Sequence, residues 1–379
     1  MGLRIGIVTE YYYPLLGGIC ENVHHTAVKL KQLGHDAKVI TSNYHTARVT
    51  PEEVPDAGIE VLRVGRSIPL HANGSSAHVT IGRHLWAGVK AILARERFDL
   101  LHLHSPLVFT LPPLALLAAK CPTIGTFHSY FEGSWTYAIF HRLLQQQFLD
   151  RLVGVTAVSE SCARALQRYF TMQPRIIPNG VDTAVFSSTA LRLERFDRSK
   201  LTLLFLGRFE LRNGLPFMLQ AFEIIKARFP EVRLIVVGDG PARALYEHLV
   251  PAHLRADVHF EGPALRLRPS YYATADIFCS PVTKASFGMT LLEAMASGRP
   301  IVATTNVGYR ELLSPDEATL VEPGSPSRFA DAVVGLLKDE RRRQEMSARG
   351  LRKAERYSWD RIVLQLLDYY HGVLQTCAS

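Results

Sequence analysis

The sequence lacks the features that would place the protein across a membrane or in an oxidising compartment. No run of about 18 or more uncharged apolar residues occurs, so no membrane-spanning helix is expected. The five cysteines are scattered and show no metal-ligand spacing, so they are predicted to be reduced thiols of a cytoplasmic protein. The first ten residues indicate a buried strand, and a signal peptide is not expected.

Sequence patterns for nucleic acid, dinucleotides and metals are also missing. Basic residues do not alternate with aromatic residues in any one tract, so nucleic-acid binding is disfavoured although the formal net charge is +8. That charge fits an anionic donor, an anionic membrane surface, or no specific partner. The first strand-to-helix crossover lacks the three-glycine fingerprint and its loop is long, which disfavours a dinucleotide oxidoreductase. No metal and no resident cofactor are expected.

What the sequence does contain is a regular alternation of apolar strands and helices. Residues 3–9 form a near-continuous apolar segment of the kind that is buried in a parallel sheet. Further strands are predicted at residues 37–41, 59–64, 100–104, 123–128, 154–158, 201–207, 233–237, 258–261, 277–280, 301–303 and 319–321. Helices are predicted between them, including residues 19–33, 81–94, 111–119, 138–149 and 161–169. This order predicts an α/β protein with open parallel sheets covered on both faces.

The length of the chain predicts two domains. A chain of 379 residues can form two separate cores. Residues 1–190 are predicted to form an N-terminal Rossmann-like domain and residues 191–359 a C-terminal one. The charged stretch of residues 190–200 is interpreted as the linker. A last helix is expected within residues 360–379.

One stretch, Thr283–Gly298, organises the functional prediction. It follows a predicted strand, and Ser286 stands where a helix cap belongs. The first helical turn would consist of Phe287, Gly288 and Met289. Its backbone N–H groups and the helix dipole would make an anion site. Glu293 lies about 10 Å further along the helix axis, which suits a nucleoside diphosphate; the alternative is an ordinary strand–turn–helix with a solvated glutamate.

The motif in this stretch is SerPheGly-x-x-LeuLeuGluAlaMetAla-x-Gly-x-Pro-Ile-Val-Ala. It resembles the signature of the family-4 retaining glycosyltransferases, in particular the phosphatidylinositol mannosyltransferase-like members, and the likeness extends over nearly the whole chain. The resemblance implies the GT-B fold, in which two Rossmann-like domains face each other across a cleft and the C-terminal helix, residues 360–379, packs back on the N-terminal domain. It also implies transfer of a mannose- or glucose-type hexose from GDP-mannose or a UDP-sugar, without a metal.

The resemblance assigns roles to this stretch, with one departure. The backbone around Ser286 is implied to take the donor diphosphate, and Glu293 corresponds to the ribose-binding second glutamate of a spaced pair. The first glutamate of that pair falls at Ala285, which has no carboxylate. Lys284, beside it, is a candidate for contact with the sugar.

Two glycines form a second candidate region. Gly17 and Gly18 close the first strand–loop–helix crossover, and adjacent glycines permit positive φ angles and near contact with a ligand. A tight turn is the alternative interpretation. In the enzymes that the sequence resembles, this loop meets the donor phosphate or sugar.

His128 ends an apolar strand and is the third candidate. Ligands of open parallel sheets bind beyond the carboxyl ends of the strands, although a lone histidine there is more often packed or solvated. The ThrPheHisSer context resembles that of the mannosyltransferase-like members, which implies that His128 faces the donor sugar and supports catalysis. His102 and His104 alternate with leucines on one strand, and packing is predicted for both.

Arg208 follows the first strand of the second domain and is the candidate cation for the leaving diphosphate. A guanidinium can bridge two phosphate oxygens. The resembling enzymes have a lysine shortly after this arginine, but Asn213 occupies that position here. The adjacent Arg212 is a candidate replacement for the missing charge.

The acceptor site is expected in the first domain. Residues 68–94 mix basic and apolar side chains and could rest on an anionic membrane, or could be a helix packed on the sheet with a solvated face. The resemblance implies a hexosyltransferase that acts on a lipid or a saccharide acceptor. The competing hypothesis, motivated by Ala285 and Asn213, is a nucleotide-binding GT-B protein with little or no transferase activity.

Overall fold

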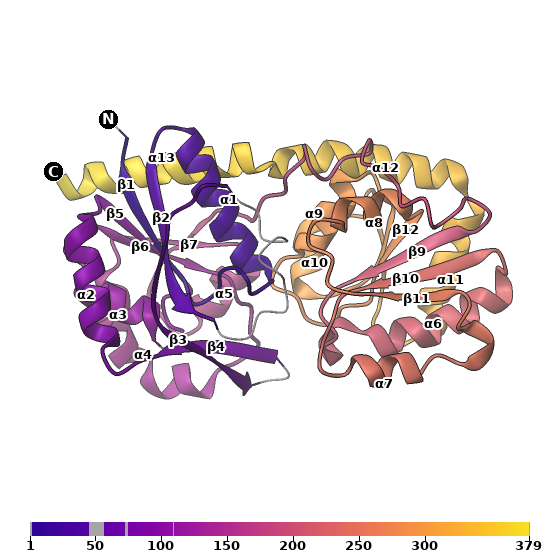
Figure 1. Cartoon of the computed structure of the whole chain (residues 1–379), viewed down its shortest axis with the longest axis horizontal. Coiled ribbons are helices and arrows are strands. Elements are labelled where there is room, and N and C mark those ends of the chain that lie inside the picture. Colours follow the sequence, from indigo (N-terminus) through magenta and orange to yellow (C-terminus); the bar gives the residue numbers. More distant parts are fainter. Residues whose placement is uncertain (1, 45–56, 73–74, 109, 379) are drawn as a thin grey trace. The chain divides into compact units, whose positions relative to one another are not determined.

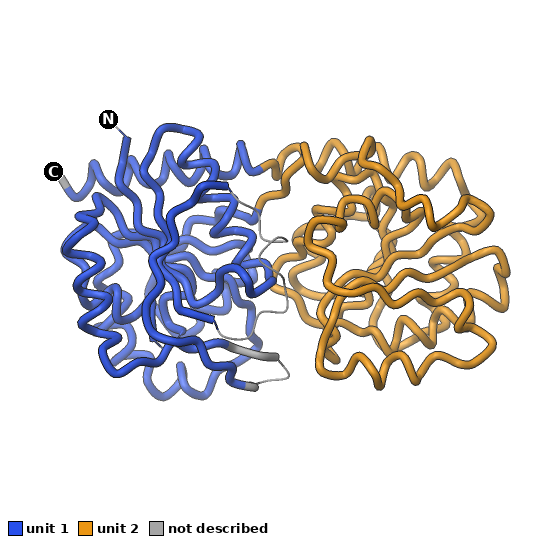
Figure 2. The backbone as a smooth tube through the Cα atoms, viewed as in Figure 1, with its two compact units in different colours: residues 1–179, 359–379 blue, residues 180–358 orange. Residues whose placement is uncertain are grey.

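A computed structural model of the protein describes residues 2–44, 57–72, 75–108 and 110–378 (Figure 1). The chain forms two compact units, shown in different colours in Figure 2. Unit 1 comprises residues Met1–Asn179 and Trp359–Ser379, and unit 2 comprises residues Gly180–Ser358. In the described residues, no helix is both long and apolar enough to cross a membrane.

The boundary between the two units lies between Asn179 and Gly180, earlier in the chain than the boundary predicted after residue 190. The backbone N–H of Val181 donates to the carbonyl of Tyr357 over 2.8 Å, and Val181 forms a parallel bridge with Ser358. Phe186 then packs edge-on against Tyr272 at 5.9 Å. In the stretch interpreted as a linker, the backbone N–H of Leu193 donates to Thr274 Oγ1 over 2.9 Å and Phe196 packs edge-on against His259 at 5.2 Å, so this stretch packs as part of unit 2.

The sheet of unit 1 has the strand order β4-β3-β2-β1-β5-β6-β7-β8. Its strands are β1 (Arg4–Val8), β2 (Asp36–Asn43), β3 (Val61–Ala72), β4 (Ser75–Ile81), β5 (Leu100–His104), β6 (Thr123–Phe127), β7 (Gly154–Ala157) and β8 (Arg175–Ile176). All neighbours are parallel except β3 and β4, which form an antiparallel hairpin at one edge. The sequence-based prediction missed β4 and began the next helix too early, because the apolar–polar alternation of residues 75–81 is weak.

The helices of unit 1 lie on both faces of this sheet. They are α1 (Gly18–Gln32), α2 (Leu85–Glu96), α3 (Leu111–Ala118), α4 (Trp135–Gln147), α5 (Glu160–Gln167) and α13 (Trp359–Ala378). Side chains alternate between the two faces along β5. Leu101 and Leu103 pack in the cluster formed with α2 and α3, whereas His102 points to the opposite face and meets Tyr370 of α13.

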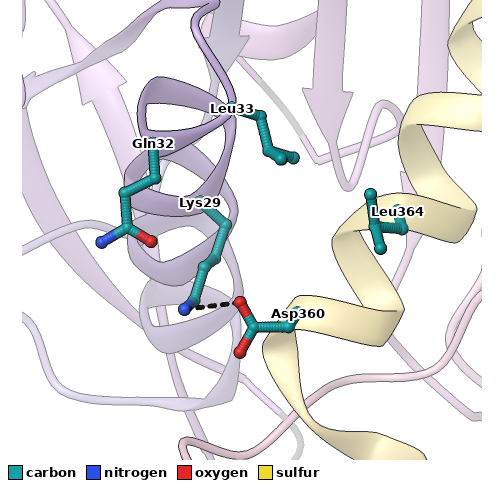
Figure 3. A pocket seen from close by; sticks show the side chains of 5 residues that line it. All are labelled: Lys29, Gln32, Leu33, Asp360 and Leu364. Carbon is teal, nitrogen blue, oxygen red and sulfur yellow. Dashed lines mark ion pairs between the residues drawn. The ribbon is translucent and has the colours of Figure 1, made fainter.

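The C-terminal helix α13 belongs to unit 1 although it follows unit 2 in the sequence. Trp359 stacks on His25 of α1, with ring centroids 5.2 Å apart. The Tyr369 hydroxyl accepts a hydrogen bond from the backbone N–H of Val155 over 2.8 Å. Figure 3 shows a surface crevice between α1 and α13, where the side chains of Lys29 and Asp360 form an ion pair of 2.7 Å.

Unit 2 is a parallel sheet of strand order β11-β10-β9-β12-β13-β14. The strands are β9 (Leu201–Leu206), β10 (Val232–Val237), β11 (Val258–Glu261), β12 (Ile277–Ser280), β13 (Ile301–Thr304) and β14 (Ala318–Val321). The helices are α6 (Leu215–Arg228), α7 (Arg243–His248), α8 (Arg268–Thr274), α9 (Met289–Ala296), α10 (Val307–Leu312), α11 (Pro326–Lys338) and α12 (Glu340–Ala354). One buried cluster joins α6, α7 and α11 to a face of the sheet.

The strand order reverses at one place in each sheet. In unit 2 the reversal lies between β9 and β12, and in unit 1 it lies between β1 and β5. Open α/β sheets bind ligands at such switch points, outside the carboxyl ends of the strands. The loops that follow β1, β5, β9 and β12 are therefore the expected places for a ligand.

The docking of α13 can be tested with two leucines on the same helix. Leu366 is 5% exposed, whereas Leu364 is 53% exposed and lines the crevice of Figure 3. Leu366→Ala should lower the free energy of unfolding by about 2–5 kcal/mol, because a cavity forms. Leu364→Ala should change it by less than about 0.5 kcal/mol. Urea denaturation followed by circular dichroism compares the two variants, and equal losses would contradict this packing of the helix.

Candidate functional site

In unit 2, the loops after β9 and β12 meet at the switch point. The backbone N–H of Thr283 donates to the carbonyl of Arg212 over 2.9 Å. Gly214 has a φ of +74°, and a Cβ added there would lie 2.3 Å from the carbonyl oxygen of Pro281. The chain therefore needs glycine at this position. The contact brings the two predicted regions, around Arg208 and around Ser286, to the same end of the sheet.

Two guanidinium groups share one carboxylate in the loop after β9. Arg208 Nη1 lies 3.2 Å from Glu210 Oε1, and Arg212 Nε lies 2.9 Å from Glu210 Oε2. Asn213 instead donates its side-chain amide to the carbonyl of Arg208 over 2.7 Å. Glu210 thus gathers two cations beside the switch point, and the Asn213 side chain shapes the loop. Glu210 was not predicted from the sequence, although its position between the two arginines was a usable signal.

The helix after β12 begins later than the sequence predicted. Ser286 is not the cap: α9 begins at Met289, and its N-cap is Gly288 with a φ of +130°. Phe287 and Gly288 precede the helix because the positive φ turns the chain there. An α-helix leaves the first N–H groups without an intrahelical acceptor. Here the turn that opens at Met289 already uses one of them, because the N–H of Leu291 donates to the carbonyl of Gly288 over 3.0 Å.

The loop before α9 is supported by residues from the end of β13 to the start of α10. Thr304 Oγ1 and the side-chain amide of Asn306 both donate to the carbonyl of Val282, over 2.6 and 2.9 Å. A Cβ added to Gly308 would lie 2.5 Å from the carbonyl oxygen of Ala285. The predicted donor loop, including Lys284 and Ala285, is therefore held by close backbone contact with α10. The requirement for glycine at position 308 was not predicted.

Glu293 is buried, with 2% of its surface exposed, so the alternative of a solvated glutamate is wrong. Arg268 Nη1 donates to Glu293 Oε1 over 2.8 Å, and the Tyr272 hydroxyl donates to Oε2 over 2.9 Å. Burial, followed by the nearby Glu293, raises the pKa of Tyr272 well above its usual value. A carboxylate can accept several hydrogen bonds, so these two contacts do not by themselves exclude a bond from a ligand hydroxyl. The role of Glu293 as a ribose ligand stays a prediction.

In unit 1, Gly17 and Gly18 are exposed at the start of α1. A Cβ added to Gly17 would meet no atom within 4 Å, so packing does not require glycine there. Some of the buried residues near these glycines are polar. The Tyr13 hydroxyl donates to Glu21 Oε1 over 3.1 Å, and burial lowers the pKa of His24, also on α1, to about 4.

Another group at the carboxyl end of β1 was missed. Glu10 is buried and accepts hydrogen bonds from the hydroxyl groups of Thr80 and Thr110 and from the backbone N–H of Leu111. Burial raises the pKa of its carboxyl group. Glu10 therefore ties β4 and the start of α3 to the end of β1.

His128 follows β6 and lies beside two histidines of β5. Its Nε2 is 2.8 Å from His104 Nδ1, and the His104 ring is 4.3 Å from that of His102. His102 in turn meets the Tyr370 hydroxyl at 2.7 Å and Thr126 Oγ1 at 2.5 Å. Burial lowers the pKa of His102 and His128 to about 3, and that of His104 well below its usual value. The three rings are therefore neutral at pH 7.

Among the described residues, no group of three or more His, Cys, Asp or Glu side chains is arranged to hold a metal ion. The side chains at the carboxyl ends of the strands are instead suited to an anion and to hydroxyl groups. Guanidinium groups and backbone N–H groups bind phosphate, and buried carboxylate and imidazole groups bind hydroxyls.

Known proteins share both the sequence and the fold. A sequence profile described as Glycosyltransferase Family 4 matches residues 16–185, and one described as Glycosyl transferases group 1 matches residues 200–339. The phosphatidyl-myo-inositol mannosyltransferase of Mycolicibacterium smegmatis is 33% identical, over 98% of this chain and 94% of that protein. The alpha-monoglucosyldiacylglycerol synthase of Streptococcus pneumoniae is 28% identical, over 82% of this chain and 73% of that protein.

The structure of Anabaena HepE in complex with UDP-glucose superposes with a TM-score of 0.77 at 19% identity, covering 98% of this chain and 100% of that one. The two sheets and the matched profiles thus define a glycosyltransferase. The chain belongs to the family-4 glycosyltransferases. The predicted GT-B class, with two parallel-sheet α/β domains, is confirmed.

Gly308→Ala tests the support of the donor loop. The added methyl group would collide with the backbone of residues 285–287, which should cost about 1–3 kcal/mol or shift the loop. Gly335→Ala is the matched control, because Gly335 is exposed on α11 and a Cβ there meets nothing within 4 Å. Thermal unfolding should show a loss for Gly308→Ala and no loss for Gly335→Ala. Equal stability of Gly308→Ala and the parent protein would contradict the contact.

The buried histidines predict a loss of stability in acid. Their pKa values are lower in the folded than in the unfolded chain, so the unfolded chain binds more protons as the pH falls below about 6.5. Each of these histidines should contribute a loss of up to about 1.4 kcal/mol per pH unit. Urea denaturation between neutral and acidic pH should show a shallower loss for His102→Asn than for the parent protein. His84→Asn, at an exposed position, should leave the pH dependence unchanged.

Proposed function

We propose that the protein is a retaining, metal-independent hexosyltransferase that moves a mannose- or glucose-type sugar from GDP-mannose or a UDP-sugar to an acceptor hydroxyl. The observation that carries this proposal is that the Arg208 loop meets the loop that leads into α9 at the switch point of unit 2, and Glu293 lies further along that helix. In this proposal the guanidinium of Arg208, together with Arg212, binds the diphosphate. The first turn of α9 adds backbone N–H donors, and Glu293 binds the ribose.

The proposed reaction uses the leaving group as the base. The bond between the sugar C1 and the diphosphate oxygen breaks, and the acceptor oxygen attacks C1 from the same face. The acceptor proton passes to the departing diphosphate, whose negative charge Arg208 and the helix dipole stabilise. Gly17, Gly18 and His128 are proposed to contact the donor phosphate and sugar, as the family resemblance implies.

A lipid acceptor is favoured over a soluble saccharide. The names of two relatives, a phosphatidyl-myo-inositol mannosyltransferase and an alpha-monoglucosyldiacylglycerol synthase, both contain a lipid. On α2, Trp86 is exposed with Lys90 Nζ 5.7 Å from the ring centroid, while Leu85 and Val89 are buried. A helix that packs with one face and presents an aromatic–basic edge suits peripheral contact of a cytoplasmic enzyme with an anionic membrane.

The second candidate function is nucleotide binding without transfer. It is favoured by Ala285, which supplies no carboxylate for the sugar, and by Asn213, whose amide is used within its own loop. Both candidates predict binding of a nucleoside diphosphate, and only the first predicts that a donor is consumed.

Arg208→Gln tests the diphosphate contact. Losing a charge-assisted contact to phosphate should weaken the binding of UDP or GDP by about tenfold or more, measured by titration calorimetry. Arg228→Gln is the matched control: its side chain is 45% exposed against 47% for Arg208, and each is paired with a carboxylate. Equal affinities of the two variants would contradict the proposed role.

The transfer itself is tested with a panel of GDP- and UDP-sugars, each with anionic vesicles that contain phosphatidylinositol or diacylglycerol. Consumption of one donor, with retention of the anomeric configuration in NMR spectra and no loss of activity in EDTA, supports the transferase. Nucleotide binding with no donor consumed across the panel would instead support the second candidate.

A further inference from the structure

The bond between His104 and His128 joins the carboxyl ends of two neighbouring strands. His104 is the last residue of β5 and pairs with Thr126 of β6, and His128 follows β6. The two ring planes are 19° from parallel, with centroids 5.0 Å apart. The nitrogens, 2.8 Å apart, are closer than stacked rings allow. The rings therefore meet edge to edge, in the geometry of an N–H···N hydrogen bond.

The other nitrogen of His104 determines which way this bond runs. Among the described residues, His104 Nε2 is one of few buried side-chain atoms without a hydrogen-bond partner. His104 is 1% exposed, so this nitrogen is shielded from bulk water. A neutral imidazole carries one proton, either on Nδ1 or on Nε2.

The two arrangements of the protons differ in cost. If His128 donates from Nε2, the proton of His104 must sit on its own Nε2, which leaves a buried N–H without an acceptor. If His104 donates from Nδ1, its Nε2 keeps only a lone pair. Orphaned buried N–H groups are rare because they forfeit a strong interaction with water. The second arrangement is therefore favoured.

We propose that His104 is a positioning residue that donates its Nδ1 proton to His128 Nε2 and so fixes His128 as the Nδ1–H tautomer. The nitrogen of a neutral imidazole that carries the proton is set by the hydrogen bond of the other nitrogen. His128 is 8% exposed, and the nitrogen left to it for a ligand bears a proton. His128 is thereby a neutral hydrogen-bond donor and not a base.

This inference rests on the proposed function in one respect, which is that His128 contacts the donor sugar. There the Nδ1–H group would donate to a sugar oxygen, and no proton would be transferred. The tautomer itself follows from His104 alone, so it can be tested whether or not the protein transfers a sugar.

The tautomer of His128 is measured by NMR on the full-length parent protein. The protein is labelled with ¹⁵N at its 15 histidines, and the His128 signals are identified as those missing from His128→Gln. The His128 signals should show a protonated, pyrrole-like Nδ1 and an unprotonated, pyridine-like Nε2. A protonated Nε2 in His128 would overturn the proposal.

Two substitutions of His104 test whether its hydrogen bond sets the tautomer of His128. Asparagine can place an N–H donor near the position of the histidine Nδ1, so His104→Asn should preserve the tautomer of His128. His104→Leu removes the donor, and the His128 proton should redistribute toward Nε2. His102→Gln is the control, because His102 is equally buried but bonds to Tyr370 and Thr126 instead. An unchanged tautomer in His104→Leu would contradict the assignment.

The effect of His104 on catalysis is tested by measuring kcat for single variants of His104 and for a double variant that also carries His128→Gln. His104→Leu should lower kcat by about tenfold, the effect of one hydrogen bond to the reacting sugar, with UDP or GDP affinity unchanged. His104→Asn should retain most of the activity. In a His128→Gln background, His104→Leu should have no further effect, whereas an independent loss would show a merely structural role. If no donor is consumed by the parent protein, the proposed function fails while the tautomer measurement still decides this inference.

Discussion

Burial of the parallel strands on both faces is the constraint on which the rest of the structure depends. Strands such as β1 and β12 are buried on both faces, so few of their interior positions carry polar groups. Polar side chains are therefore concentrated where the strands end. Glu10 follows β1, His104 ends β5, and the Arg208 loop follows β9. The packing that buries the strands therefore also determines where the polar side chains of the candidate site lie.

The groups at the strand ends are held by residues that are distant in the sequence. Glu293 is fixed by Arg268 and Tyr272 of α8, and the loop before α9 rests against Gly308. A carboxylate that is fixed before a ligand arrives loses less side-chain freedom on binding. If unit 2 holds a nucleotide as proposed, the site is largely preformed, and Ala285 and Asn213 would affect only its contacts with the sugar and with one phosphate charge.

Much of the fold could be predicted because it depends on local patterns. The six strands of unit 2 were predicted because each is a short apolar run between turn or helix signals. The hairpin β3–β4 was missed because its alternation is weaker, and the start of α9 was misplaced because the φ angle of Gly288 cannot be read from sequence. The partners of Glu293 and His128 depend on contacts between distant segments, which spacing does not reveal. The family resemblance supplied roles for the site residues, and these stay predictions.

The central claim is that the start of α9 and Glu293 hold one nucleoside diphosphate in unit 2. A crystal structure of the protein with UDP or GDP bound tests it most directly. The account predicts a diphosphate at the backbone N–H groups of the first turn of α9, within reach of Arg208, and a ribose hydroxyl on Glu293 while Arg268 keeps its contact. A nucleotide bound elsewhere in the chain, or a Glu293 carboxylate closed off by Arg268 and Tyr272 with the nucleotide present, would contradict it.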